Sequence, residues 1–313
     1  MSTAISVEDL VKRYKGSRVN AVDGITFDVQ PGEFFALLGV NGAGKSTTIN
    51  MLCTLLEKTS GKAFVNGYES GIQDSDIRQS IGVVFQTSVL DDMLTARENL
   101  TCRSSFYGIA EGVVADRIID LADRLDMRNF LDKPYGKLSG GQRRKCDIAR
   151  SLIQHPRLLF LDEPTTGLDP QSRIDLWNTI QEIRATSDMA IVLTTHYMEE
   201  ANSADRVAII DQGKIVAIDT PQNLKERFSK DTLTLYVEQQ QMPTVEAMLE
   251  REQRAWTREG DRYRVTYARA EDTGFDVIAL LSQLKPYIRS FEVRQGDMDN
   301  VFLNVVGRRL GHE

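Results

Sequence analysis

Short apolar runs alternate with longer amphipathic stretches over the first two-thirds of the 313-residue chain. Runs of four to six residues rich in Val, Ile, Leu or Phe predict buried strands over residues 34–38, 81–85, 158–161, 190–194 and 207–210. Apolar residues at helical spacing predict helices over residues 46–56, 96–106, 113–125, 142–152 and 171–183. Strands that are apolar on both faces and alternate with helices favour an α/β fold, a mostly parallel sheet flanked by helices.

The start and the middle of the chain carry two antiparallel signals. Segments 5–11 and 19–29 lie on either side of a polar turn at 15–20 and predict a small antiparallel β-layer beside the main sheet. Strands 207–210 and 215–218 meet at Asp211-Gln212-Gly213-Lys214, which is typical of a hairpin. A short helix over 221–228 begins with proline.

The pattern changes at about Lys230. A strand over 233–237, a helix over 244–250, a hairpin over 254–267, a helix over 275–284, a strand over 288–293 and a helix over 298–310 are predicted in turn. This β-α-β-β-α-β order resembles the ferredoxin-like arrangement. We therefore expect two domains, 1–229 and 230–313, the second a small α+β accessory domain.

Composition excludes several classes of protein. The net charge of −7 and the pI near 5.2 argue against a broad nucleic-acid-binding surface. Three cysteines without a C-x-x-C pair favour neither a disulfide framework nor a zinc site, and indicate an intracellular protein. No stretch approaches 18 uninterrupted apolar residues, so a place at a membrane would require a partner.

A glycine-rich run follows the predicted strand 34–38 and precedes the helix at 46. Gly39-Val40-Asn41-Gly42-Ala43-Gly44-Lys45-Ser46 fits the P-loop pattern G-x-x-x-x-G-K-[ST]. Its backbone N–H groups and the helix N-terminus are expected to hold the phosphates of a nucleotide. Lys45 is expected at the β- and γ-phosphates, Ser46 on Mg²⁺ and Thr47 on the α-phosphate. The alternative is a fortuitous glycine-rich turn.

Two carboxylates end the apolar strand at 158–161. Asp162 suits a magnesium ligand, and Glu163 could accept a proton from an attacking water or orient that water. The alternative is that Asp-Glu-Pro only ends the strand and starts a turn.

A second helix start carries glycines. In Leu138-Ser139-Gly140-Gly141-Gln142, Ser139 suits an N-cap and the glycines expose backbone N–H groups, so a second anion site is predicted. By its pattern alone this segment could also be an ordinary loop with a capped helix.

These motifs occur together and in a fixed order. The P-loop, LSGGQ, LLFLDEP, Gly167-Leu168-Asp169-Pro170 and His196 resemble the nucleotide-binding subunit of ATP-binding cassette (ABC) transporters, over roughly residues 5–228. The resemblance implies a head-to-tail dimer with two ATP molecules between the P-loop of one subunit and the LSGGQ of the other. Ser139 and Gly141 would then touch the γ-phosphate of ATP held by the partner chain, and Gly140 and Gln142 belong to the same motif.

Further roles come only with the resemblance. It implies that Gln86 contacts Mg²⁺ and the membrane subunit, that Asp169 crosses the dimer interface, that His196 contacts the γ-phosphate and that Tyr14 stacks on adenine. Taken alone, Tyr14 could be a half-buried strand residue and His196 a surface or capping residue.

The segments between and after the motifs indicate the type of ABC protein. Residues 45–138 carry no sustained heptad pattern and the chain has one P-loop, which favours a subunit that docks on separate membrane proteins. Residues 165–170, 194–205 and 298–303 resemble daunorubicin-resistance-type exporters. We therefore expect an ATP- and Mg²⁺-dependent ATPase at the cytoplasmic face of the cell membrane. It would act as a homodimer, or with a related ATPase subunit, beside integral-membrane permease subunits, and export a drug-, antibiotic- or lipid-like substrate.

Two other functions stay open from the residues. A soluble ABC ATPase acting on ribosomes or nucleic acid would need no membrane partner, and the acidic charge argues against it. The P-loop alone would also allow a kinase, which the LSGGQ motif and His196 disfavour. The sequence does not indicate which compound is transported.

Overall fold

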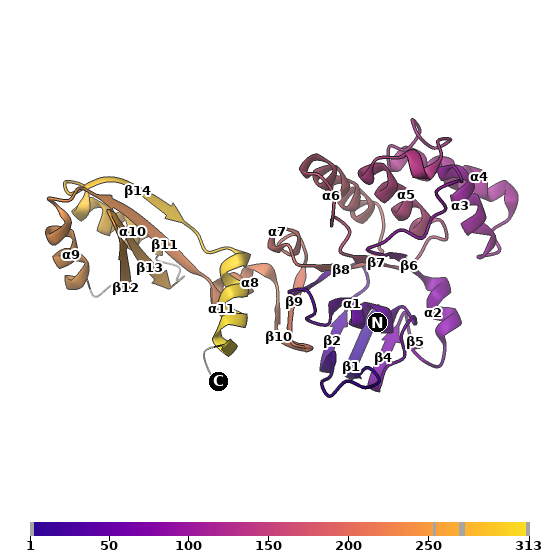
Figure 1. Cartoon of the computed structure of the whole chain (residues 1–313), viewed down its shortest axis with the longest axis horizontal. Helices are drawn as coiled ribbons and strands as arrows, with labels where there is room; N and C mark the ends of the chain where they lie inside the picture. Colours follow the sequence, from indigo (N-terminus) through magenta and orange to yellow (C-terminus); the bar gives the residue numbers. More distant parts are fainter. Residues whose placement is uncertain (1–2, 253–254, 269–272, 311–313) are drawn as a thin grey trace. The chain divides into compact units, whose positions relative to one another are not determined.

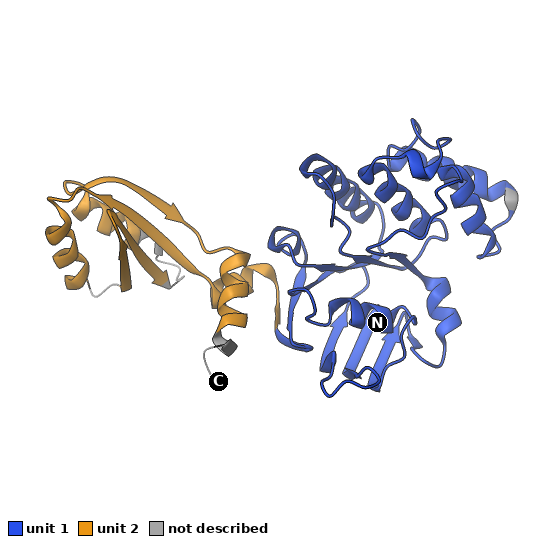
Figure 2. Ribbon diagram, in the orientation of Figure 1, with its two compact units in different colours: residues 1–216 blue, residues 217–313 orange. Residues whose placement is uncertain are grey.

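The computed structural model describes residues 3–252, 255–268 and 273–310. The chain divides into two compact units, unit 1 over residues 1–216 and unit 2 over residues 217–313 (Figure 2). This division lies earlier than the expected domain boundary at 229/230. Helix α8 (Pro221–Phe228) belongs to unit 2 because it packs against α11 (Met298–Leu310).

A six-stranded sheet forms the centre of unit 1 in the order β10-β9-β3-β8-β7-β6. Its described parallel pairs are β9 with β3, β3 with β8, β8 with β7 and β7 with β6. The strands are β3 (Phe34–Leu38), β6 (Ile81–Val84), β7 (Leu158–Asp162), β8 (Ala190–Thr195), β9 (Arg206–Asp211) and β10 (Lys214–Asp219). Every residue of β3, β7 and β8 is buried, which confirms the prediction of strands that are apolar on both faces.

A second, antiparallel sheet has the order β2-β1-β4-β5. Strands β1 (Ile5–Lys12) and β2 (Val22–Val29) confirm the predicted antiparallel layer. The prediction began the second strand three residues too early, at Val19, which is 74% exposed. Strands β4 (Ser60–Val65) and β5 (Tyr68–Glu69) were not predicted, because β4 opens with the polar run Ser-Gly-Lys and β5 has two residues.

Helices cover both faces of the six-stranded sheet (Figure 1). Helix α1 lies on one side with the antiparallel layer, and α5 and α6 lie on the other. The helices of unit 1 are α1 (Lys45–Leu52), α2 (Asp74–Ser80), α3 (Ala96–Ser105), α4 (Glu111–Arg124), α5 (Gly140–Leu152), α6 (Pro170–Ala185) and α7 (Met198–Ala201). Helix α1 ends four residues before the predicted end at 56, and Thr54 just beyond it has φ of 61°. None of the helices in the described ranges has the length and apolar character needed to cross a bilayer.

Unit 2 contains a four-stranded antiparallel sheet in the order β12-β13-β11-β14. Its strands are β11 (Lys230–Val237), β12 (Ala255–Glu259), β13 (Arg262–Ala268) and β14 (Ile288–Arg294), and its other helices are α9 (Met242–Arg251) and α10 (Thr273–Leu284). Because β13 lies between β11 and β12, and β11 between β13 and β14, the unit consists of two interleaved βαβ segments. Residue 254, where the hairpin 254–267 was predicted to begin, lies outside the described residues.

Candidate nucleotide site

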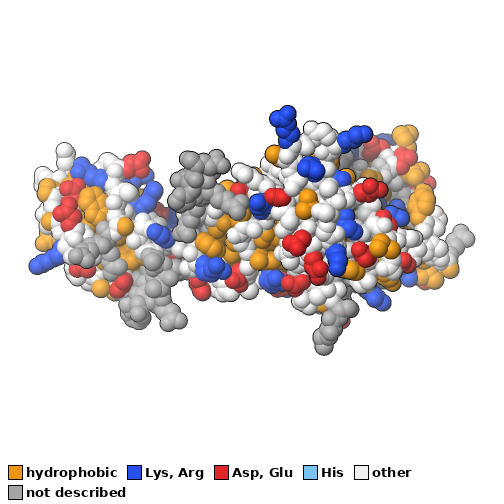
Figure 3. Space-filling model, turned by 90° about the horizontal axis from the view of Figure 1, so that it is seen from below, with side chains coloured by type: hydrophobic (Ala, Val, Ile, Leu, Met, Phe, Trp, Pro, Cys, Tyr) orange, Lys and Arg blue, Asp and Glu red, His pale blue; other side chains and the backbone are white. Residues whose placement is uncertain are grey.

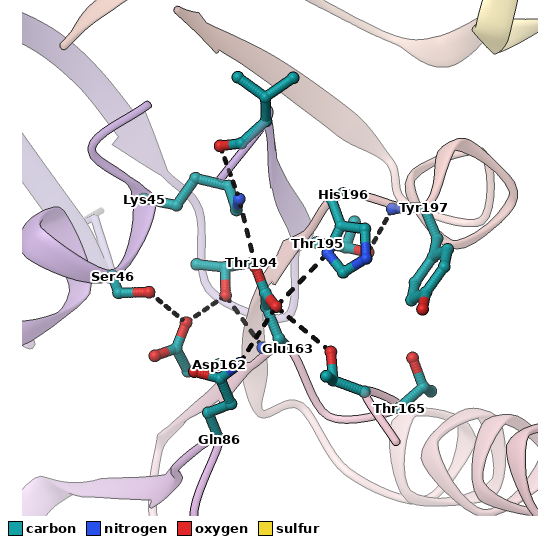
Figure 4. Close-up of polar contacts among 12 residues, drawn as sticks. Lys45, Ser46, Gln86, Asp162, Glu163, Thr165, Thr194, Thr195, His196 and Tyr197 are labelled. Atoms are coloured by element: carbon teal, nitrogen blue, oxygen red, sulfur yellow. Dashed lines mark hydrogen bonds and ion pairs between the residues drawn. The ribbon is translucent and has the colours of Figure 1, made fainter. Parts of the chain in front are cut away.

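The ends of four parallel strands bring the candidate residues to one edge of the main sheet. Gly39 follows β3, and Gln86 follows β6 after one residue. Asp162 is the last residue of β7, Glu163 comes next, and His196 follows β8. Neighbouring parallel strands end on the same side, so the side chains of Gln86, Glu163 and His196 point toward a common centre (Figure 4).

Two positions in the loop between β3 and α1 require glycine, because a side chain there would clash with the neighbouring backbone. A Cβ atom on Gly39 would lie 2.5 Å from the carbonyl oxygen of Ile210, and one on Gly44 would lie 2.5 Å from that of Ala21. Gly44 also has φ of 110°, which favours glycine. No side chain caps α1 and its first turn holds no acidic residue, so its first N–H groups and its positive end remain available to an anion. This loop fits a bound phosphate chain.

Lys45 lies folded back over that loop and is 4% exposed. Its Nζ donates to the carbonyl oxygen of Gly39 at 2.8 Å and to that of Val40 at 3.2 Å. The same Nζ forms an ion pair with Glu163 Oε1 at 3.2 Å. The buried ammonium group is thus compensated and points into the centre of the site.

Glu163 is the meeting point of the cluster. Its Oε2 lies 3.4 Å from His196 Nδ1 and accepts from Gln86 Nε2 at 3.5 Å and from Thr166 Oγ1 at 3.2 Å. Burial acts to raise the pKa of Glu163, but the attraction of Lys45, followed by that of His196, outweighs it and leaves the pKa below its usual value. The carboxylate is therefore ionised at neutral pH, as a proton acceptor must be.

The backbone of Glu163 is in a left-handed conformation with φ of 45°. Its N–H donates to Thr194 Oγ1 at 3.0 Å, which helps to hold this uncommon conformation. The side chain is thereby aimed away from the line of β7 and into the cluster.

Oxygen donors form the candidate metal position. Ser46 Oγ donates to Asp162 Oδ1 at 3.1 Å, and Thr194 Oγ1 donates to the same oxygen. Among the described residues there is no group of three or more His, Cys, Asp or Glu side chains able to hold a metal. A hydroxyl and one carboxylate do fit Mg²⁺, which takes its remaining ligands from water and from substrate phosphates. Gln86, the third predicted ligand, instead makes its contact with Glu163.

Tyr14 and Thr47 lie beside the start of α1. The phenol oxygen of Tyr14 is 3.2 Å from Thr47 Oγ1, and its ring is 45% exposed. An exposed ring next to a phosphate-binding loop can stack on a base, a contact worth about 1–3 kcal/mol in other proteins.

The other predicted residues form a second group. Ser139 and Gln142 cap α5 reciprocally, which confirms the predicted N-cap. Asp169 caps α6 by accepting from Ser172 N–H at 3.0 Å, and a Cβ atom on Gly141 would lie 2.8 Å from Ser172 Oγ. No hydrogen bond or ion pair in the described part of the chain joins Ser139–Gln142 to Lys45 or Ser46.

Sequence reasoning missed Thr194, Thr166 and Arg144, which all contact Glu163. Thr194 is opposite Asp162 in the pairing of β7 with β8. The chain order of strands does not give their order in the sheet, so no pattern could identify Thr194. Arg144 is a buried arginine in the middle of a helix, where a solvent-facing side chain is the ordinary expectation.

Comparison with known proteins gave a family and several relatives. The family model described as "ABC transporter" matches residues 22–166. The daunorubicin/doxorubicin resistance ATP-binding protein DrrA of Streptomyces peucetius is 37% identical over 308 residues, covering 97% of this chain and 92% of that protein. The linearmycin resistance ATP-binding protein LnrL of Bacillus subtilis is 38% identical over 230 residues, covering 73% of each chain.

Solved structures agree with the fold. The structure of cbiO1 from Clostridium perfringens, part of the ABC transporter complex cbiONQ, matches with a TM-score of 0.67 and 26% identity, over 80% of this chain and 98% of that one. The dimeric ATP-binding cassette MJ0796 bound to ADP and Pi matches with a TM-score of 0.63 and 24% identity, over 69% and 98% of the two chains.

Proposed function

The chain belongs to the ABC transporter family and is an ATPase of that family, and from this premise we propose that it drives the export of a drug-, antibiotic- or lipid-like compound. The observation that carries the proposal is the convergence of Lys45, Ser46, Asp162, Glu163 and His196 at one edge of the sheet. The names of DrrA and LnrL, which refer to antibiotic resistance, support the substrate class.

We assign the chemistry of hydrolysis to this cluster. The loop 39–44 and the start of α1 bind the phosphates of ATP, and Lys45 attracts the β- and γ-phosphates. Ser46 and Asp162 would hold Mg²⁺, with Gln86 as a further ligand, and the ion would neutralise charge on the phosphates. Glu163 accepts a proton from the attacking water, and His196 contacts the γ-phosphate beside it.

The working unit in this proposal is a head-to-tail dimer, of two copies or of this chain with a related subunit. The exposed capped start of α5, with Ser139, Gly140 and Gly141, would contact the γ-phosphate of ATP held by the partner chain, and Asp169 would lie at the interface. Tyr14 would stack on adenine in the chain's own site. Closure of the dimer on ATP and reopening after hydrolysis would move the membrane subunits.

The export route itself belongs to separate integral-membrane permease subunits. None of the helices in the described ranges could span a bilayer, and we place the chain as a peripheral subunit at the cytoplasmic face of the membrane. The surface around residues 86–99 would contact the permease.

Replacement of the proton acceptor tests the chemistry. Glu163→Gln should bind ATP as the unsubstituted chain does, hydrolyse it about 10²–10⁴-fold more slowly and accumulate as a dimer with ATP. Turnover with radiolabelled ATP and the mass of the particle in solution measure these effects. A monomeric Glu163→Gln variant with full activity would contradict the role of Glu163.

Purification of the tagged chain from detergent-solubilised membranes of its host tests the transport role. A stoichiometric hydrophobic protein with several spans in the eluate is the expected result. Recovery with ribosomal or DNA-bound proteins instead would leave the ATPase chemistry intact and overturn export.

A further inference from the structure

Helix α5 is attached along the free edge of the main sheet. Among the strands of the described residues, β6 is the last in the sheet order and pairs with β7. Three side chains near α5 donate to carbonyl oxygens along β6 and just beyond it: Arg144 to Phe85, Arg150 to Val83 and Gln154 to Ile81. These acceptors are every second residue, as expected for carbonyl groups that face one side of a strand.

The two backbones also approach closely between these contacts. A Cβ atom on Gly82 would lie 2.4 Å from the carbonyl oxygen of Ser151 in α5. At Gly82, helix α5 and strand β6 are therefore in direct backbone contact.

Arg144 extends this connection to the catalytic cluster. Its Nε donates to the carbonyl oxygen of Pro164 at 2.5 Å, its Nη1 to that of Phe85 at 2.5 Å and its Nη2 to that of Glu163 at 3.0 Å. The side chain is almost fully buried, and its nearest carboxylate, on Asp147, lies 3.9 Å away. Three carbonyl groups thus compensate a buried cation, which fixes the position of the guanidinium group.

The segment that carries Gln86 is held at both ends by α5. Arg144 contacts Phe85, the residue before Gln86, and Asp147 Oδ1 accepts from Ser88 Oγ at 2.6 Å. Gln86 and Glu163, which contact each other, are therefore both tied to the same helix.

We propose that Arg144 is a positioning residue. It fixes where Glu163 and Gln86 lie in the site, and this placement follows the position of α5. The inference rests on the proposed function, in which the start of α5 contacts the nucleotide held by the partner. A shift of α5 toward that nucleotide moves the guanidinium group and, with it, the carbonyl of Glu163, whose backbone has φ of 45°. The proton acceptor of one site thus responds to the nucleotide in the other, and hydrolysis at the two sites is cooperative.

Substitution of Arg144 by Met and by Lys tests this link. Arg144→Met should lower kcat about 10²-fold, because misplacement of a reacting group has effects of that size. The dissociation constant for MgATP should change by less than about threefold, because Arg144 touches no residue of the loop 39–46. Arg144→Lys should recover part of kcat, and its Hill coefficient for ATP should fall toward 1 relative to the unsubstituted protein.

Arg117→Met is the matched control. Arg117 Nη1 also donates to a backbone carbonyl, that of Ile153 at 2.9 Å, and makes no contact with Glu163 or residues 85–88. It should keep kcat and the Hill coefficient, and its thermal unfolding should be measured beside that of both Arg144 variants.

Two results would overturn the link and leave the proposed function standing. One is a normal kcat and Hill coefficient in Arg144→Met. The other is a parallel loss of kcat and MgATP affinity that follows the fall in thermal stability and occurs equally in Arg117→Met. An unsubstituted protein that does not hydrolyse ATP would overturn the proposed function and the link together.

Discussion

At the scale of single residues, Thr194 connects the two carboxylates of the site. Its hydroxyl donates to Asp162 Oδ1 and accepts from the N–H of Glu163, so one oxygen orders both the candidate metal ligand and the proposed proton acceptor. Lys45, Gln86 and His196 then approach Glu163 from three other segments. The order of the site thus depends on a residue that is not expected to touch the nucleotide.

Removal of this hydroxyl should impair hydrolysis. Thr194→Val keeps the shape of the side chain but removes one of two donors to Asp162 Oδ1 and one of two acceptors of the Glu163 N–H, at a cost of about 1–3 kcal/mol. We expect a fall in kcat of about tenfold or more and a raised Mg²⁺ requirement, measured by ATP turnover at varied Mg²⁺. Thr194→Ser retains the hydroxyl and should keep most of the activity. Equal losses in both variants would argue for a packing role.

The ionised state of Glu163 makes a prediction for stability against pH. Because its pKa is lowered in the folded protein, its contribution is fully present above the usual value for an unfolded glutamate, about 4.3, and is lost as the pH falls through the folded value. The difference in unfolding free energy between the unsubstituted protein and Glu163→Gln should therefore be constant between about pH 5 and about pH 7. Denaturant titrations at several pH values measure it. A difference that falls as the pH is lowered from about 7 to about 5 would contradict a lowered pKa of Glu163.

Residues at strand ends were the ones that sequence could predict. Asp162, Glu163 and His196 lie at the ends of buried apolar runs, and parallel strands end at one edge, so their meeting follows from the pattern. Lys45 begins α1 and was predicted from the P-loop pattern instead. Other residues that contact Glu163, such as Arg144, could not be predicted. Whether they reach Glu163 depends on the order of strands in the sheet and on the rotation of the helices, and no local sequence pattern encodes either.

At the scale of elements, continuous apolar runs predicted the main strands. The small strands β4 and β5 have weak patterns and were not predicted. Strands β3, β7 and β8 are buried on both faces and were predicted almost to the residue. Strand β4 is half polar and β5 has two residues, so neither stands out from a loop. The end of α1 was misplaced because apolar residues continue to Leu56, beyond the turn at Thr54.

The close packing of α5 on β6 predicts a severe effect of a single methyl group. Gly82→Ala places a Cβ atom 2.4 Å from the carbonyl oxygen of Ser151, so the helix must move away from the strand. We expect a loss of about 1–3 kcal/mol in unfolding free energy, measured by chemical denaturation.

Gly112→Ala is the matched control for that variant. Gly112 lies in α4, and a Cβ atom added to it would meet no other heavy atom within 4 Å. Because alanine favours a helix over glycine, this variant should become more stable by about 0.5–1 kcal/mol. Destabilisation of both variants to the same extent would contradict the steric explanation.

At the scale of the whole molecule, the boundary between the units determines which fragments should fold. Helix α8 packs against α11, its Leu224 is buried, and Asn304 Nδ2 donates to the carbonyl oxygen of Phe228 at 2.8 Å. The sequence analysis assigned α8 to the first domain. The pattern of a short helix that follows a hairpin does not indicate that the helix packs against another helix much later in the chain.

Two fragments test this boundary. Fragment 217–313 should unfold at a higher temperature than fragment 230–313, because the loss of Leu224 burial alone costs about 1.5–3 kcal/mol. Calorimetry of both fragments measures the difference. Equal unfolding temperatures would favour the boundary at 229/230.

The net charge is −7, and on the face of unit 1 seen in Figure 3 basic and acidic side chains are interspersed. Long-range attraction of a polyanion needs a clustered basic field.

The side chains that hold α5 on β6 also bear on aggregation. The last strand of a sheet presents unpaired carbonyl groups, which can pair with a strand of another molecule. Here Arg144, Arg150 and Gln154 occupy three such groups, and Gly82 lets the helix backbone close over the strand. The edge of the main sheet nearest Glu163 is therefore covered against strand exchange, so the contacts inferred to position that residue also close this edge.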